Sequence, residues 1–251
     1  MSKLRLLAIA VIALLGVAAV AYAQSGNSYT VDGSTTVTGG SKSKPKPGGL
    51  SFKFTVSAGD QVPSVIKTYK ITFEGGRVNT KVAPACSASA MDRAQSDRVC
   101  PKGSQIGSGT IQNFVAKVGD PAASATRCTL PFKIYNSGNN RAALWIQTGP
   151  PNCIAAVAKA IDARWANSAT SASISFTVPD ELRHQLSLDL PVSSASATIR
   201  KITKTMRVGG KRRQVGYLES IGCKDRKRDI TATFTDEQGR SVTAKKTLNR
   251  C

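Results

Sequence analysis

The stretch Leu50-Ser51-Phe52-Lys53-Phe54-Thr55-Val56 decides the fold class of this 251-residue chain, because apolar and polar residues alternate strictly along it. A period of two residues is typical of a β-strand with one buried face. Similar runs lie at 65–73 (interrupted by Lys67), 130–134, 144–146, 174–178 and 230–234. They predict an all-β protein whose antiparallel sheets stack as a β-sandwich, immunoglobulin-like or jelly-roll-like.

Turn residues predict two β-hairpins. Residues 199–208 and 211–220 flank Gly209-Gly210, a two-residue connection suited to a primed turn. Residues 230–235 and 241–247 flank the polar tetrapeptide 236–239. The sequence therefore predicts that the last fifth of the chain consists of paired strands.

One short helix is predicted over residues 154–165. Ile154, Val157, Ile161 and Trp165 recur there at helical spacing, and alanines fill the positions between them. Asn152 is suited to cap this helix, and the adjacent cysteine would tie it to the sheet.

The first 23 residues have the layout of a secretory signal peptide. Lys3 and Arg5 precede an apolar run over 6–20, and Ala21-Tyr22-Ala23 matches a small-x-small cleavage site. An uncleaved membrane anchor is the alternative, since residues 6–23 reach the lower length limit for a membrane span. We expect cleavage, a mature chain without a membrane span, and a secreted or extracellular protein that can associate with the cell envelope.

The mature chain divides into two parts by composition. Residues 24–49 are rich in Ser, Gly, Pro and Lys and predict a flexible, basic lead. Residues 50–251 predict a single disulfide-stapled sandwich domain, which is long enough to bury a large core.

Six cysteines remain in the mature chain, an even number that favours disulfides in a secreted protein. Sequential pairing is predicted because each loop is then short: Cys86 with Cys100, Cys128 with Cys153, and Cys223 with Cys251. Each such bridge would stabilise the fold by about 3 kcal/mol in the chain-entropy model. No Cys-x-x-Cys pair occurs and His184 is the single histidine, so we predict no metal site and no cofactor.

Three local patterns carry a family resemblance. They are Cys100-Pro101-Lys102-Gly103-Ser104-Gln105-Ile106-Gly107-Ser108-Gly109, the segment 216–223 and the segment 231–235. Together they resemble a group of uncharacterised secreted, disulfide-containing, all-β proteins of high-GC Gram-positive bacteria. The resemblance extends over roughly residues 50–251; it implies a secreted β-sandwich and assigns no functional residues.

Two enzyme classes have partial matches in the sequence. Ser220-Ile221-Gly222-Cys223 is somewhat similar to the nucleophile segment of L,D-transpeptidases, but a thiolate needs a nearby imidazole, and His184 lies 39 positions upstream. Glycoside hydrolysis needs two acids across a cleft, for which Asp180 and Glu181 are candidates, as are Glu74 and Glu219. We find no catalytic constellation and predict a non-enzymatic protein, with a cell-wall hydrolase or transpeptidase as a distant alternative.

Positive charge is the strongest functional signal. The chain has 35 Lys plus Arg against 15 Asp plus Glu, a net charge of +20, which favours polyanionic partners. The cations concentrate on the 199–220 hairpin and in the loop that follows it. The predicted binding residues are Arg200, Lys201, Lys204, Arg207, Lys211, Arg212, Arg213, Lys224, Arg226, Lys227 and Arg228.

Two functions follow from this distribution. The first is binding of an anionic envelope polymer or glycan through the basic hairpin, with a strong dependence on salt. The second is a structural or adhesive sandwich module that binds another protein, in which the lysines only prevent edge-strand aggregation. Specific nucleic-acid recognition is not expected, since few aromatic residues lie among the cations.

Overall fold

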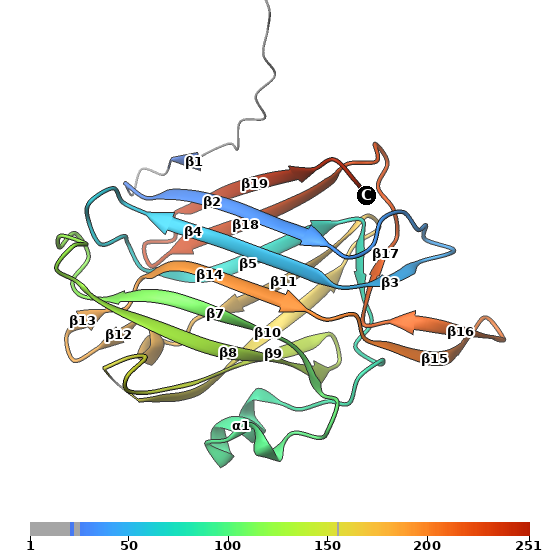
Figure 1. Cartoon of the computed structure of the whole chain (residues 1–251), viewed down its shortest axis with the longest axis horizontal. Coiled ribbons are helices and arrows are strands. Elements are labelled where there is room, and N and C mark those ends of the chain that lie inside the picture. Colours follow the sequence, from blue (N-terminus) through green and yellow to red (C-terminus); the bar gives the residue numbers. More distant parts are fainter. Residues whose placement is uncertain (1–20, 23–25, 155) are drawn as a thin grey trace, which may run out of the picture.

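The computed structural model describes residues 21–22, 26–154 and 156–251, and it is dominated by one twelve-stranded antiparallel sheet (Figure 1). Every neighbouring pair of strands in this sheet is antiparallel, as the alternating sequence pattern predicts. In spatial order the strands are β1 (Ala21–Tyr22), β2 (Ser28–Thr35), β4 (Leu50–Ser57), β14 (Val192–Ile199), β7 (Gln105–Val115), β8 (Thr126–Gly138), β9 (Arg141–Thr148), β10 (Val157–Asn167), β11 (Ser171–Thr177), β5 (Ile66–Glu74), β18 (Arg228–Asp236) and β19 (Ser241–Leu248).

The remaining elements are short and surround this sheet. Three small antiparallel sheets are present in the described residues. The first contains β3 (Lys46–Gly48), β17 (Leu218–Ser220) and β6 (Gly76–Val78). The second pairs β12 (His184–Gln185) with β13 (Leu188–Asp189), and the third pairs β15 (Thr203–Val208) with β16 (Lys211–Gly216). Within the described ranges, the helical elements are α1 (Ala88–Ala94) and two single 3₁₀ turns, η1 (Asp97–Val99) and η2 (Asp180–Leu182).

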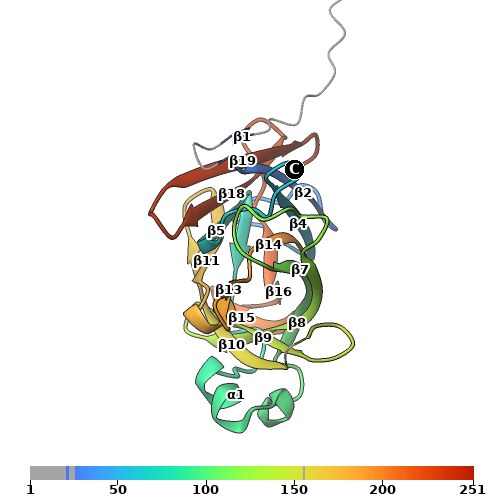
Figure 2. The ribbon, with the colours of Figure 1, turned by 90° about the vertical axis from the view of Figure 1, so that its left-hand side faces the viewer.

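The large sheet curls until its ends approach, which gives a sandwich that is nearly closed on itself (Figure 2). The layer of β4, β14 and β7 faces the layer of β5 and β11 across the interior. At the open side β2 and β19 lie next to each other without a ladder of backbone hydrogen bonds. An ion pair of 3.9 Å between Lys246 Nζ and Asp32 Oδ1 joins them at the surface. The all-β sandwich prediction is confirmed.

Aromatic side chains pack across the open side of the sandwich. The Phe234 ring on β18 lies 4.7 Å from the Tyr29 ring on β2, 5.2 Å from Phe54 on β4 and 5.8 Å from Tyr69 on β5, measured between ring centroids. Each of these four residues occupies an inward position of its alternating strand and is at least 96% buried. Side-chain packing therefore holds β2 and β18 together where the backbone ladder is missing.

All three predicted disulfides are confirmed: Cys86–Cys100, Cys128–Cys153 and Cys223–Cys251. The two predicted hairpins are also present, as β15–β16 around Gly209-Gly210 and as β18–β19. The first hairpin is shorter than predicted, because residues 217–220 leave β16 and pair with β3 and β6 instead.

The prediction of a helix over 154–165 is wrong. Residues 157–167 form β10, which pairs with β9 on one side and β11 on the other. Ile161, Ala163 and Trp165 face the interior at a period of two, so the apolar positions that fit a helix fit a strand as well. Cys153 accordingly ties β8 to a loop and not to a helix.

The one α-helix of the described residues is α1, at a place where the sequence pattern did not predict it. Ser87 caps α1 by accepting a hydrogen bond from Ala90 N at 3.2 Å. Met91 is fully buried and packs α1 on the outer face of β9 and β10, against Trp145 and Ala160. None of the helices in the described part of the chain has the length and apolar character needed to cross a membrane.

The prediction of a flexible lead over 24–49 is wrong for residues 28–35, which form β2 along the full length of β4. Tyr29 and Val31 alternate inward on this strand and are buried, although Ser, Thr and Gly dominate the surrounding sequence. Residues 46–48 form β3. The predicted signal peptide lies outside the described residues, apart from Ala21–Tyr22, whose backbone pairs with β2.

Candidate functional site

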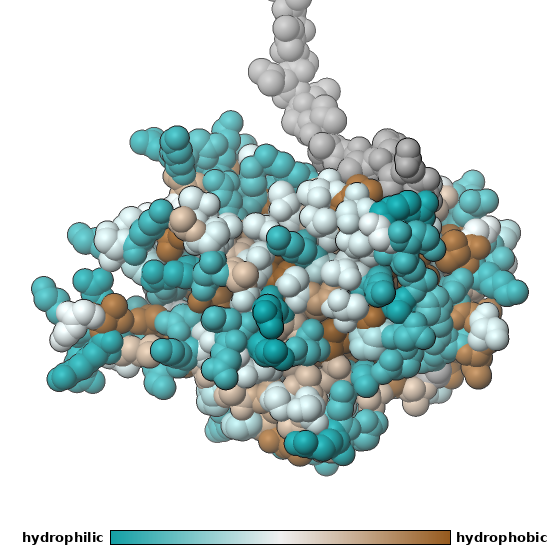
Figure 3. Space-filling model, turned by 180° about the vertical axis from the view of Figure 1, so that it is seen from behind, coloured by the Kyte–Doolittle hydropathy of each residue, from teal (hydrophilic) through white to brown (hydrophobic). Residues whose placement is uncertain are grey.

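The candidate site is built around the β15–β16 hairpin, which projects from one end of the sandwich (Figure 1). Gly209 and Gly210 have φ angles of 56° and 77°, the left-handed conformation that a tight turn between two strands requires. Viewed from behind, the hairpin is an arm at the left with a mainly hydrophilic surface (Figure 3). The turn thus carries the predicted cations away from the body of the protein.

Ten of the eleven predicted binding residues are exposed at this end of the sandwich. The ten are Arg200, Lys201, Lys204, Arg207, Lys211, Arg212, Arg213, Lys224, Arg226 and Lys227. None of them forms an ion pair with a carboxylate in the described ranges. Their positive charge is therefore not neutralised within the described structure.

Arg228 does not belong to this surface. It is 97% buried, and its Nη2 donates a hydrogen bond of 2.8 Å to Ser220 Oγ. Burial lowers the pKa of its guanidinium. The position at the start of β18, between the Cys223–Cys251 disulfide and β17, explains why this arginine points inward and cannot contact a polymer.

Acidic residues near the hairpin are few and already bound. Glu219 on β17 is buried; its carboxylate accepts hydrogen bonds from Arg77 Nη2 at 2.6 Å and from Gly216 N at 3.0 Å. Asp225 accepts from Lys227 N at 2.9 Å and is exposed. Glu219 therefore fixes the base of the hairpin and is not placed as a catalytic acid.

The hairpin and the 224–227 loop are connected through the segment 38–46. Arg213 Nη1 donates to Ser43 O at 3.1 Å, and Gly39 N donates to Cys251 O at 2.6 Å. This segment adds exposed cations that sequence reasoning did not include, namely Lys42, Lys44 and Lys46. The signal that could have indicated them is the Ser-Lys-Ser-Lys-Pro-Lys run, which lies within the predicted lead.

A shallow cleft of about 550 Å³ lies where this segment meets the C-terminus. Lys46, Arg226 and Arg250 line it together with the backbone of Gly40 and Gly222. We call the ten exposed predicted residues, together with Lys42, Lys44, Lys46 and Arg250, the basic end of the molecule. A cleft with several cations and exposed backbone is suited to anionic groups such as phosphates or sulfates.

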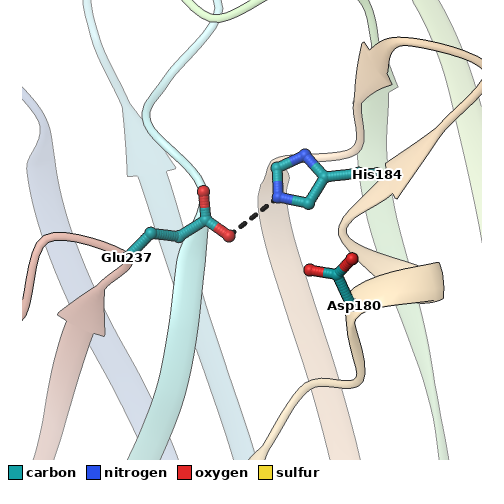
Figure 4. A group of neighbouring side chains, drawn as sticks. All are labelled: Asp180, His184 and Glu237. Atoms are coloured by element: carbon teal, nitrogen blue, oxygen red, sulfur yellow. Dashed lines mark hydrogen bonds and ion pairs between the residues drawn. The ribbon is translucent and has the colours of Figure 1, made fainter.

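A second polar cluster lies at the opposite end of the sandwich (Figure 4). His184 Nε2 lies 2.8 Å from Glu237 Oε1, and His184 Nδ1 lies 2.9 Å from Asp189 Oδ1. Asp180, His184 and Glu237 each offer one possible metal-ligand atom, and these atoms lie within 4.8 Å of one another. However, the Arg183 guanidinium forms ion pairs with both Glu237 and Asp180, so these two carboxylates are already neutralised by a side-chain cation. The cluster ties the 180–189 segment to the β18–β19 turn.

The predicted enzyme candidates do not assemble into a site. Cys223 is bonded to Cys251 and is not a free thiolate. Glu74 accepts a hydrogen bond from Asp229 N at 3.1 Å, and Glu181 forms an ion pair with Lys159 at 2.8 Å. The hydrogen bond from Lys159 lowers the pKa of Glu181, which opposes a role as a general acid.

Comparisons of the chain with protein-family models, with curated proteins and with solved structures give no match.

Proposed function

We propose that this protein is a secreted, non-enzymatic binding protein that engages anionic polymers of the cell envelope or extracellular space through its basic end. The observation that carries the proposal is the set of ten exposed predicted cations without carboxylate partners, on and beside a projecting hairpin. Uncompensated cations on one end concentrate the positive field there and attract a polyanion from solution.

The disulfides and the N-terminal sequence support secretion. Three disulfides are stable in an oxidising compartment and are rare in the cytosol of most organisms. The basic N-terminus, apolar run and small-x-small site of residues 1–23 are the signal that would deliver the chain there.

A salt series tests this function. Binding of the mature protein to long-chain inorganic polyphosphate is measured by calorimetry between about 50 mM and about 200 mM salt. If the basic end engages about six anionic groups, its affinity falls about a thousandfold over this range, because counterions are released on binding. Binding that does not change with salt would contradict the proposal and favour a protein partner; no binding to polyphosphate, heparin or isolated envelope would leave the cations only a role in solubility.

A further inference from the structure

We propose that the interior of the sandwich binds a single unbranched aliphatic chain that carries a small uncharged head group. This site goes beyond polyanion binding and shares none of its residues with the basic end. It is the cavity between the layer of β4, β14 and β7 and the layer of β5 and β11, and it extends to the end covered by η2, β12 and β13.

The lining of the cavity is almost entirely apolar. Side chains such as Phe52, Phe132, Leu144 and Ile174 contribute aliphatic and aromatic surface from both layers. No lysine, arginine, aspartate or glutamate is among the lining residues in the described part of the chain. An ionised head group would find no partner inside, so the ligand must be uncharged where it is buried.

The shape of the cavity selects a chain over a ring system. Its volume is about 160 Å³, similar to an apolar cavity that admits benzene in another protein. The lining nevertheless extends along β10 from Val157 to Trp165, about 26 Å of strand. A small volume distributed over such a length is a narrow canal, which fits one extended chain and excludes a sterol or a two-chain lipid.

Three lining residues with an unpartnered polar atom indicate a head group with hydrogen-bonding capacity. Tyr69, Asn113 and Trp165 line the cavity, and Tyr69 Oη, Asn113 Oδ1 and Trp165 Nε1 are buried atoms without a hydrogen-bond partner among the described residues. Burial raises the pKa of Tyr69, so its hydroxyl remains a neutral donor. A hydroxyl head group can accept a hydrogen bond from Tyr69 or donate one to Asn113. Such a ligand would supply the hydrogen-bond partner that a buried polar atom needs.

The rim offers a way in for an apolar chain. Leu186 at the tip of the β12–β13 hairpin is 94% exposed and Ile154 in the facing loop is 64% exposed, yet both line the cavity. Exposed apolar side chains of this size beside the canal provide a surface that the aliphatic ligand can contact before it enters. Trp165 lies at the other end of β10, away from this rim.

The test uses Trp165 as an internal reporter. The chain has two tryptophans, and the other, Trp145, packs on the outer face of the sheet beneath α1. The Trp145→Phe variant therefore reports on the cavity alone, and Trp165→Phe is its matched control. A homologous series of alcohols brominated at the chain terminus is titrated into each variant, below the critical micelle concentration, and tryptophan emission is recorded.

We expect saturable quenching in Trp145→Phe and none in Trp165→Phe. Affinity is expected to rise about fourfold for each added methylene until the chain fills the canal, and to stop rising beyond that length. Alcohols brominated next to the hydroxyl should quench less, because that end stays near the rim. Equal quenching of both variants, a lack of length dependence, or no quenching of Trp145→Phe would overturn the proposal.

Two further variants distinguish binding in the canal from nonspecific binding of apolar probes to the protein surface. Ala195→Leu with Ala197→Leu fills the canal from β14; it should weaken binding at least tenfold while the melting temperature stays the same or rises. Tyr69→Phe should weaken alcohol binding about fivefold and leave the binding of the matching bromoalkane unchanged. Neutral probes do not depend on the basic end, so failure here leaves the polyanion proposal intact.

Discussion

Replacing Lys211, Arg212 and Arg213 by serine is expected to weaken the binding of polyphosphate about a hundredfold at low salt. The three cations occupy the start of β16 beyond the Gly209-Gly210 turn, where they are exposed and unpaired with acids. Each cation near a polyanionic surface contributes about 1 kcal/mol, so the loss of three corresponds to about two decades of affinity. Calorimetry or fluorescence anisotropy with labelled polyphosphate measures the change.

A matched variant distinguishes a local effect from an effect of net charge. Lys53, Lys67 and Lys70 are exposed on the outer faces of β4 and β5, away from the hairpin. Their replacement by serine changes the net charge equally and should lower affinity far less. If both triple variants lose affinity to the same degree, the net charge of the whole molecule attracts the polymer and the basic end is not a site.

Phe234→Ala is expected to lower the free energy of unfolding by about 3–5 kcal/mol. Phe234 is 99% buried and packs on Tyr29, Phe54 and Tyr69 from three other strands. Truncation leaves a cavity at the side of the sandwich where β2 and β19 share no backbone ladder. Urea denaturation of the oxidised protein, followed by circular dichroism, measures the loss.

Thr233→Ala on the same strand is the control for this substitution. Its hydroxyl faces outward and shares a hydrogen bond of 2.8 Å with Thr243 on β19. We expect a loss of about 1 kcal/mol or less, since the bond is exposed to water. Comparable losses in the two variants would show that β18 contributes through cross-strand pairing and not through the aromatic cluster.

Much of the fold could be predicted from the sequence because strands with one buried face alternate visibly. Residues 50–56 are the clearest case, and β4 covers them with Phe52, Phe54 and Val56 inward. The disulfides followed from short loops. The Gly209-Gly210 hairpin followed from the turn type that two consecutive glycines allow.

The missed elements have patterns that local reasoning cannot resolve. Ile161 and Trp165 are four residues apart, which satisfies the helical period and the strand period equally, and alanine between them favours the helical interpretation. Only pairing with β9 and β11 decides for a strand. In β2 the inward positions are Tyr29, Val31 and Gly33. Gly33 lies against the Ile230 side chain, and as a glycine it does not contribute to an alternating apolar pattern in the sequence.

The candidate sites were predictable to different degrees. A run of cations such as Lys211-Arg212-Arg213 is visible in the sequence and lies on the surface as expected. The prediction of Arg228 as a binding residue is wrong. Its burial depends on the positions of β17 and of the Cys223–Cys251 disulfide, which the local sequence does not reveal. The internal canal could not be predicted, since it is the volume that side chains from ten strands leave unfilled, eight of them in the large sheet.

Lysine footprinting with and without polyphosphate locates the surface that binds the polymer. The protein is acetylated briefly at low salt, and the modification of each lysine is read by mass spectrometry. We expect polyphosphate to protect Lys204, Lys211, Lys224 and Lys227 and to leave Lys53 and Lys67 reactive. Uniform protection of all lysines, or protection that avoids the hairpin and the 224–227 loop, would contradict the claim that the basic end is the binding surface.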